Sequence, residues 1–156
     1  MNKATPFLMF NDQLEVALEL YASIFPGTKV TQRARAGKGG PLQSARFEVC
    51  GQRFMGFNGG PHFKFSEAFS IFVSCEDQEE VDTYWNKLVK AGGKPTMCGW
   101  INDPFGLSWQ IVPKRFTELI GDGNPEKVKA VVDAMMKMQK LDVAVLEKAW
   151  RDAGPV

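Results

Sequence analysis

Two stretches of the sequence contain the residue types that could do chemistry, residues 57–61 (FNGGP) and residues 99–113 (GWINDPFGLSWQIVP). Each combines a turn with side chains suited to lining a cavity. In the longer stretch the run NDPFG predicts a turn, because Asn and Asp bond their own backbone and Gly accepts a positive φ. An alternating strand is expected to follow, in which Gln110 points into a cleft. An indifferent polar side chain on the open face of a hairpin is the alternative.

Gln110 and Asp103 are the candidate catalytic residues. Asp103 would need a raised pKa to act as a general base, whereas an aspartate beside Pro104 in a turn is more often a turn residue. Glu48 and Glu67 are the other carboxylates near the two stretches. The sequence has no Ser-His-Asp set, no pair of histidines and no carboxylate pair at a fixed spacing, so nothing identifies a nucleophile.

The composition excludes several classes of partner. The 156 residues are 44% hydrophobic and 12% aromatic, enough to bury a core in one domain or in two small fused halves. Lysine plus arginine number 19 against 18 acidic residues, so no nucleic-acid partner and no anionic membrane partner is expected. The sequence shows no signal peptide and no long apolar run, which predicts a cytoplasmic protein. Cys50, Cys75 and Cys98 lack any CxxC spacing and are expected to be buried, reduced thiols.

The first half has the pattern of a strand, a helix and three strands. Residues 6–10 are a short apolar run, and apolar residues at helical spacing follow over residues 14–25. Asp12 and Glu15 have the form of a capping box, and residues 26–27 (PG) end the helix. Strands are expected at residues 29–34, 44–50 and 52–57, with a flexible loop at residues 37–41 (GKGGP).

The second half repeats this order. A strand is expected at residues 69–74, a helix at residues 77–91, and further strands at residues 94–99 and 107–113. The run DQLEV that begins at Asp12 reappears as DQEEV beginning at Asp77, at an offset of 65 residues. GQRF at residues 51–54 matches GLSW at residues 106–109 at an offset of 55. The sequence therefore predicts a duplicated βαβββ module whose second copy lacks the region that contains GKGGP.

Helical patterns occupy the rest of the chain. Asn124 followed by Pro125 predicts a capped helix. Its apolar stripe consists of Val128, Val131, Val132, Met135 and Met138, and a last short helix carries Val145, Leu146, Ala149 and Trp150. We expect this extension, residues 116–156, to pack on the domain or across a dimer interface.

Two tandem βαβββ modules resemble the vicinal oxygen chelate superfamily, which includes glyoxalase, bleomycin-resistance proteins and extradiol dioxygenases. The runs FNGGPHFKFSEAFSIFVSCEDQEEVDTYW, CGWINDPFGLSWQIVP and AMMKMQKLDVAVLEKA are similar to its PhnB-like branch, often described as 3-demethylubiquinone-9 3-methyltransferase domain proteins. The resemblance implies an α+β fold in which two modules, about residues 1–60 and 66–115, form a curved mixed-sheet cup within a domain of residues 1–115. It also implies that half-cups pair between subunits, so a homodimer is expected.

The resemblance locates the positions at which metal-dependent members place their ligands. These lie on the first and last strands of each module, near Thr5 or Pro6, near Ser70 or Ile71, and at Met55 and Gln110. Only Gln110 is a plausible ligand, and one amide oxygen cannot hold a catalytic divalent ion. His62, the only histidine, could join only if its loop folded inward. We therefore expect no metal and no other cofactor.

A conventional S-adenosylmethionine site is not expected either. Such a site needs a glycine-rich turn between a parallel strand and a helix, and an acidic residue at the end of the next strand. The only glycine-rich candidate, GKGGP at residues 37–41, joins two strands with an antiparallel pattern. The methyltransferase description of the branch therefore has no support in this sequence.

The expected ligand pocket draws on the two stretches and on the duplication. Its residues are Met55, Phe57, Asn58, Trp100, Phe105, Trp109 and Gln110. Aromatic and thioether groups with few polar ones favour an apolar or aromatic small molecule. The leading hypothesis is a metal-independent binder, which sequesters its ligand as bleomycin-resistance proteins do. The alternatives are an enzyme of the superfamily (a metal-dependent lyase, isomerase or dioxygenase, or the methyltransferase of the branch name) and a dimeric domain whose cup is filled by its own side chains.

Overall fold

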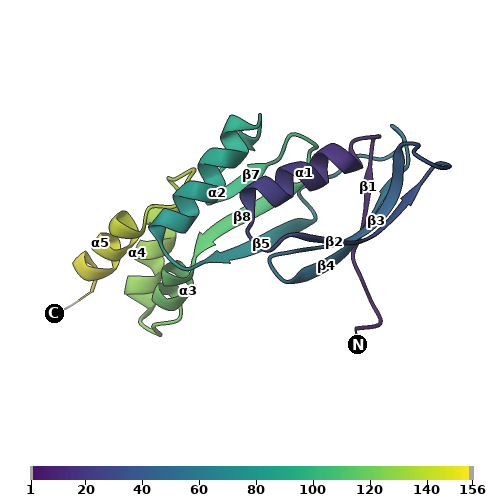
Figure 1. The fold of residues 1–156 in the computed structure, drawn as a ribbon. Coiled ribbons are helices and arrows are strands. Elements are labelled where there is room, and N and C mark those ends of the chain that lie inside the picture. The colour runs from purple at the N-terminus through teal and green to yellow at the C-terminus, as the bar shows by residue number, and fades with distance from the viewer. Residues whose placement is uncertain (1, 155–156) are drawn as a thin grey trace. The chain divides into compact units, whose positions relative to one another are not determined.

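The duplication expected from the sequence is present in the computed structural model, which describes residues 2–154. The chain divides into two compact units, Met1–Ser66 and Glu67–Val156. Each unit contains an open four-stranded mixed sheet with a helix against one face (Figure 1). The predicted α+β class and its two βαβββ modules are confirmed.

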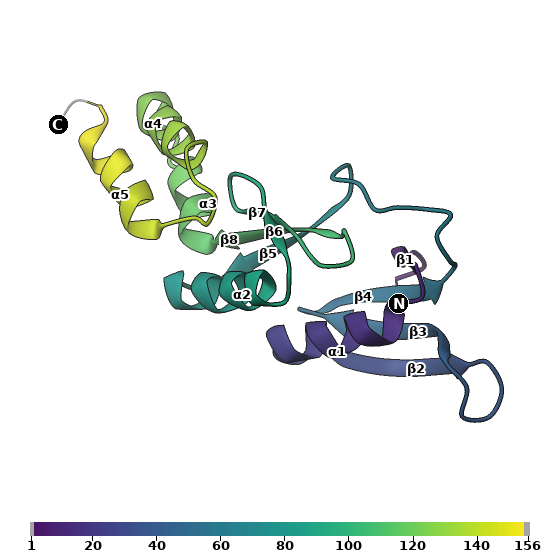
Figure 2. The same ribbon diagram turned by 90° about the horizontal axis from the view of Figure 1, so that it is seen from above.

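The first unit contains β1 (Phe7–Phe10), α1 (Leu14–Ile24), β2 (Lys29–Arg35), β3 (Leu42–Val49) and β4 (Gln52–Asn58). The strand order is β1-β4-β3-β2, in which β1 runs parallel to β4 and the other neighbours are antiparallel. Figure 2 shows α1 along one face of this sheet, the face that buries Phe47 and Phe54. Gly56 permits the close approach of α1, because a Cβ at Gly56 would lie 2.6 Å from Leu14 Cδ1.

The second unit contains β5 (Ser70–Cys75), α2 (Gln78–Lys90), β6 (Lys94–Pro95), β7 (Trp100–Asn102), β8 (Ser108–Pro113), α3 (Lys114–Ile120), α4 (Pro125–Met135) and α5 (Val143–Asp152). The strand order β5-β8-β7-β6 repeats that of the first sheet, with β5 parallel to β8. The short β6 and β7 correspond to the longer β2 and β3, as the shortened repeat predicts. None of the helices in the described part of the chain has the length and apolarity needed to cross a membrane.

The strand prediction for residues 94–99 is wrong beyond Pro95. The chain turns there, since Cys98 and Gly99 have positive φ values of 57° and 83°. The next strand, β7, begins at Trp100 and ends where the predicted NDPFG turn begins. A two-residue strand is too short for an alternating pattern to reveal its ends.

The two modules begin their helices differently, although their sequences match at this point. In α2, Asp77 is the N-cap, and its Oδ1 accepts the Glu80 N–H at 2.9 Å. In α1 the predicted capping box is wrong. Asp12 has a φ of 56°, and the N-cap residue is Gln13, which makes no side-chain cap bond. Sequence identity at a cap therefore did not determine the backbone conformation.

The three cysteines do not share one environment. Cys75 is buried, as expected. The expectation is wrong for Cys50, which is exposed, and for Cys98, which is half-buried. Cys50 lies in the β3–β4 turn with a φ of 50°, and a turn residue of this kind points its side chain away from the core.

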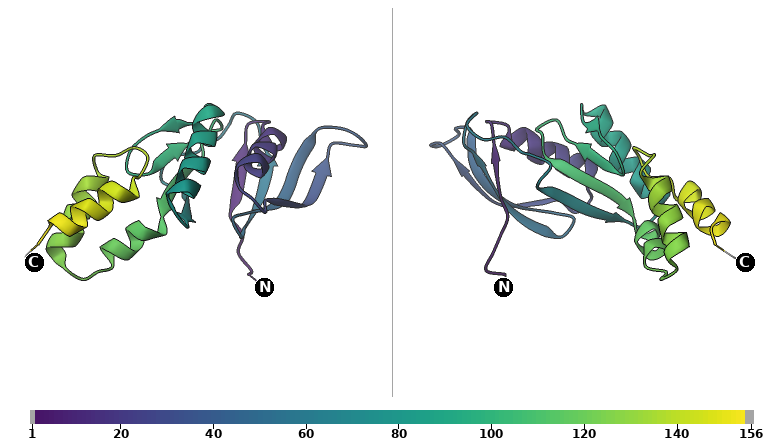
Figure 3. Two further views of the ribbon diagram at one scale, coloured as in Figure 1. Left: turned by 60° about the vertical axis from the view of Figure 1, so that its left-hand side comes forward. Right: turned by 180° about the vertical axis from the view of Figure 1, so that it is seen from behind.

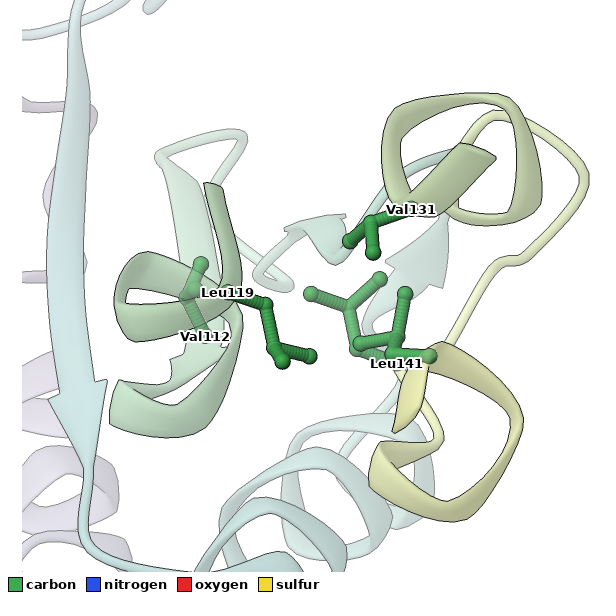
Figure 4. Close-up of a cluster of buried hydrophobic side chains, with 5 residues drawn as sticks. Val112, Leu119, Val131 and Leu141 are labelled. Atoms are coloured by element: carbon green, nitrogen blue, oxygen red, sulfur yellow. The ribbon is translucent and has the colours of Figure 1, made fainter. Parts of the chain in front are cut away.

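The C-terminal extension packs on the second unit of its own chain. A buried cluster is formed by Val112, Leu119, Val131, Leu141 and Leu146 (Figure 4). Met135, Met138 and Trp150 pack around this cluster. The helices α4 and α5 lie side by side, in yellow-green and yellow in Figure 3. The methionine stripe predicted for α4 thus contributes to a core within the chain.

Polar side chains fix the starts of α4 and α5 within this extension. Gln78, at the start of α2, donates from Nε2 to the Leu141 carbonyl at 2.9 Å and accepts the Val143 N–H at 2.8 Å. Asn124 caps α4 as predicted, and its Oδ1 accepts two backbone N–H groups of the first turn at 3.1 and 3.3 Å. The extension is therefore attached to the helix-covered side of the second module as well as to the end of β8.

A buried carboxylate holds the turn that precedes β8. Asp103 is 4% exposed, and its Oδ1 accepts the N–H groups of Phe105 at 2.9 Å and Leu107 at 3.0 Å. Its Oδ2 accepts the indole N–H of Trp109 at 3.0 Å. Because successive side chains of a strand point to opposite faces, holding Trp109 on the α2 side directs Gln110 to the open side.

This bond yields a stability prediction with a matched control. Trp109→Phe removes a donor from the buried Asp103 carboxylate, and we expect the free energy of unfolding to fall by about 1–3 kcal/mol. Trp150→Phe makes the same change where the indole N–H is buried without a partner in the described residues. Its cost should stay below about 1 kcal/mol, although Lys127 Nζ lies 3.9 Å from that ring. Urea denaturation measures both, and equal losses would contradict the role given to Asp103.

Candidate functional site

The open face of the first sheet, away from α1, is hollowed. The hollow has a volume of about 290 Å³ and receives residues from all four strands. Small-molecule pockets span about 300–1,000 Å³, so this hollow is at the lower end of the range. Its side chains include Phe7, Gln32, Ser44, Arg46, Met55 and Phe57.

Strand register brings these side chains together. Arg46 on β3 is paired with Met55 on β4, and Met55 is paired in turn with Phe7 on β1. Ser44 and Phe57 form the next pair on the same face. The rings of Phe7 and Phe57 are 6.4 Å apart. Alternate residues of a strand share a face. The residues that alternate with these lining residues along β1, β3 and β4 therefore face α1 and are buried.

The open face of the second sheet carries a polar pair. Gln110 on β8 is in register with Phe72 on β5 and Trp100 on β7. Gln110 Nε2 donates to Ser70 Oγ at 2.9 Å. The pair therefore presents one acceptor, Gln110 Oε1, and one donor, the Ser70 hydroxyl, beside two aromatic side chains.

A chain of hydrogen bonds continues along the same face. Ser108 Oγ donates to Asn102 Oδ1 at 2.7 Å, and Asn102 Nδ2 donates to Glu67 Oε1 at 3.2 Å. The pKa of the Glu67 carboxyl is lowered, chiefly by the Asn102 hydrogen bond. Glu67 is therefore ionised at neutral pH and is a weak base, which makes it unsuited to abstracting a proton.

Four of the predicted pocket residues lie on the open faces. Met55 and Phe57 line the hollow of the first sheet. Trp100 and Gln110 are register partners on the second sheet. Phe105 is half-buried in the turn before β8, where its backbone N–H bonds Asp103.

Three other predicted site residues hold the fold together. Trp109 is fully buried against the α2 side, so it does not line the open face. The Asp103 carboxylate already accepts three hydrogen bonds, which gives it a structural role in place of a catalytic one. Asn58 accepts the Leu14 N–H at 3.0 Å and donates to the Leu42 carbonyl at 2.9 Å. Asn58 therefore joins α1, β3 and β4 and satisfies the first turn of α1.

Sequence reasoning missed the polar residues of the hollow, Gln32, Ser44 and Arg46. A signal for two of them exists, because Ser44 and Arg46 alternate with the apolar Ala45 and Phe47 as in a strand with one buried face. Gln32 lies next to an irregularity in the β2–β3 register. No local pattern indicates which face such a residue joins.

The positions that the superfamily uses for metal do not supply a ligand set in this chain. Met55 offers a thioether, and the Ser70 hydroxyl and the Gln110 amide bond each other. Within residues 2–154 no three His, Cys, Asp or Glu side chains gather where they could hold an ion. His62 is exposed. Divalent metals in catalytic sites usually have three protein ligands, so these residues do not fit a catalytic metal.

Comparisons with known proteins agree with this fold. A family model described as 3-demethylubiquinone-9 3-methyltransferase matches residues 2–112. A PhnB protein from Bacillus cereus is 33% identical, with a TM-score of 0.64 over 72% of this chain and 99% of that chain. A search of curated protein sequences found no match.

More distant structures share the fold alone. A glyoxylase/bleomycin resistance protein/dioxygenase domain from Frankia is 18% identical, with a TM-score of 0.51 over 72% of this chain and 91% of that chain. The fosfomycin resistance protein FosX from Listeria monocytogenes is 14% identical, with a TM-score of 0.50 over 70% of this chain and 89% of that chain. With the family model covering most of the sequence, the chain belongs to the PhnB-like, 3-demethylubiquinone-9 3-methyltransferase domain family of the vicinal oxygen chelate superfamily.

Proposed function

We propose that the protein binds a small apolar or aromatic molecule and does so without a catalytic metal. The observation that carries the proposal is the hollow on the open face of the first sheet, where Phe7, Met55 and Phe57 form an apolar floor. Phe7 is 54% exposed, and apolar side chains gathered on a concave face favour a ligand over water. Side chains of the first unit leave the hollow open. This supports the ligand-binding hypothesis over the alternative in which the cup is filled by its own side chains.

An enzyme of the same superfamily is the second candidate. The feature in its favour is the Ser70–Gln110 pair, whose free amide oxygen could bind a polar group of a substrate. The fold is shared with a dioxygenase-type domain and with a fosfomycin resistance protein, but fold does not determine a reaction. The Glu67 and Asp103 carboxylates are both engaged in hydrogen bonds. Binding therefore accounts for the residues better than catalysis.

Methyl transfer from S-adenosylmethionine receives no support from the residues present. The glycine-rich loop at residues 37–41 connects β2 and β3, which are antiparallel with Arg35 opposite Leu42. A nucleoside cofactor of this kind is held at the turn between a parallel strand and a helix. The loop joins no helix, so the cofactor does not fit it.

The binding proposal predicts a difference between two phenylalanine variants. N-phenyl-1-naphthylamine, a neutral aromatic probe, should gain fluorescence on binding the protein. Phe57→Ala removes part of the apolar floor and should weaken binding by about tenfold, the equivalent of about 1.4 kcal/mol. Phe63→Ala is the control, because Phe63 is 67% exposed and lies outside the strands. No saturable binding, or equal effects of the two variants, would contradict the proposal.

If the protein needs no metal, the purified protein should contain none in stoichiometric amount. Native mass spectrometry combined with elemental analysis of the purified protein should find no zinc, manganese, iron or nickel at one ion per chain. The physical reason is that Gln110 is the only plausible ligand among the positions that the superfamily uses for metal, and one amide oxygen cannot hold a catalytic divalent ion. A stoichiometric metal that is lost in Gln110→Ala would overturn this part of the proposal and favour the enzyme.

We further propose that the protein is a homodimer. Large apolar side chains remain exposed on the described chain, among them Phe72 on the second sheet and Met136 and Val145 on the extension, and a second copy would cover such surface. Sedimentation velocity at micromolar concentration should show the mass of two chains. A single species of 17.4 kDa would contradict the dimer without affecting the binding proposal.

A further inference from the structure

Arg46 differs from most arginines of the chain in having no carboxylate partner. Arg35, Arg53, Arg115 and Arg151 each lie within ion-pair distance of a glutamate. Arg46 forms no ion pair with any residue between 2 and 154, yet it belongs to the lining of the hollow. A guanidinium presents five N–H donors in a planar fork that matches a carboxylate or another oxyanion.

The side chains next to Arg46 are polar on one side only. Its register partner on β2 is Gln32, and Ser44 lies two residues before it on the same face. Among the described residues, neither side chain donates to or accepts from another group. On the other side, β4 and β1 contribute the apolar floor that begins with Met55. The hollow therefore has a polar half over β2 and β3 and an apolar half over β4 and β1.

The charge of this face favours an anion. Lys29 on β2 is in register with Glu48 on β3, and Arg53 lies 3.8 Å from the Glu48 carboxylate. Together with Arg46 these residues place three cations against one carboxylate on the open face. A concave surface with an excess of charge of one sign raises the local concentration of ligands that carry the opposite charge.

We infer that the ligand of this hollow is an amphiphilic anion, a small molecule with an oxyanion group on an apolar or aromatic body. Arg46 binds the oxyanion through its fork, Gln32 and Ser44 add neutral hydrogen bonds, and Phe7, Met55 and Phe57 receive the apolar body. The inference rests on the proposed binding function and specifies the chemical class of its ligand. It makes Arg46 a specificity-determining residue, since a neutral analogue would use the apolar half alone.

The test compares two probes that differ by one charged group. 8-Anilinonaphthalene-1-sulfonate is N-phenyl-1-naphthylamine with an added sulfonate, so the ratio of their dissociation constants isolates the anion. The wild-type protein should bind the anionic probe about tenfold more tightly, as charge-assisted hydrogen bonds allow. Arg46→Met should abolish this ratio while binding of the neutral probe persists. Raising the salt concentration should reduce the ratio, because Arg46 is exposed and its charge is screened.

The matched control is Arg33→Met. Arg33 lies one residue from Gln32 on β2 but is paired with Ala45, whose side chain is buried on the α1 side. The Arg33→Met substitution removes the same charge from the opposite face of the sheet. The ratio of the two dissociation constants should therefore stay at the wild-type value. Arg46→Lys keeps the charge without the fork and should give an intermediate ratio. Thermal melting checks that each variant is folded.

The outcomes separate this inference from the proposed function. Equal affinities of the two probes for wild-type protein, or equal effects of Arg46→Met and Arg33→Met, would overturn the anion inference while leaving the binding function intact. Absence of saturable binding for both probes would overturn the two together. If Arg46→Met does not fold, Arg46→Gln carries the same expectation, and an unchanged ratio in that variant refutes the inference.

Discussion

The hydrogen bond from the Trp109 indole to the buried Asp103 carboxylate determines the geometry of the second module. A strand that slips by one residue exchanges its two faces, and apolar residues of β8 lie on both of its faces, with Trp109 and Ile111 on one and Val112 on the other. Hydrophobicity alone therefore leaves the register open. The carboxylate resolves it by accepting two turn N–H groups and the indole together, which leaves Gln110 on the open face.

In the first module a different polar residue, Asn58, connects the helix to the strands. Asn58, at the end of β4, bonds the first turn of α1 and the start of β3, while the aspartate that caps α2 has a counterpart at Asp12 that does not cap. Both modules thus use their most conspicuous polar turn residues to hold the fold. The open faces are left with apolar groups, with the Ser70–Gln110 pair on the second sheet, and with Gln32, Ser44 and Arg46 in the hollow, whose side chains have no partner among the described residues.

The two open faces have diverged although their topology is the same. Long β2 and β3 strands support a hollow with an apolar half and a cationic half in the first module. Short β6 and β7 strands leave the second module with a Gln110–Ser70 pair beside aromatic side chains. Two modules of the same topology therefore present different open faces, one with the hollow and one with a neutral donor and acceptor.

Sequence by itself determined the element order, the duplication, the α4 cap at Asn124 and the family, because each depends on local periodicity, turn chemistry or long motifs. It also named Met55, Phe57, Trp100 and Gln110 as pocket residues, all of which lie on the open faces of their sheets. Tertiary structure alone decided that Asp103, Trp109 and Asn58 belong to the fold and that Arg46 joins the hollow. The Asn58 bond and the pairing of Arg46 with Gln32 join residues that are distant in the chain, and the second of these follows an irregular register. The Asp103–Trp109 bond depends on how the turn between the two residues folds back. No alternating pattern encodes such contacts.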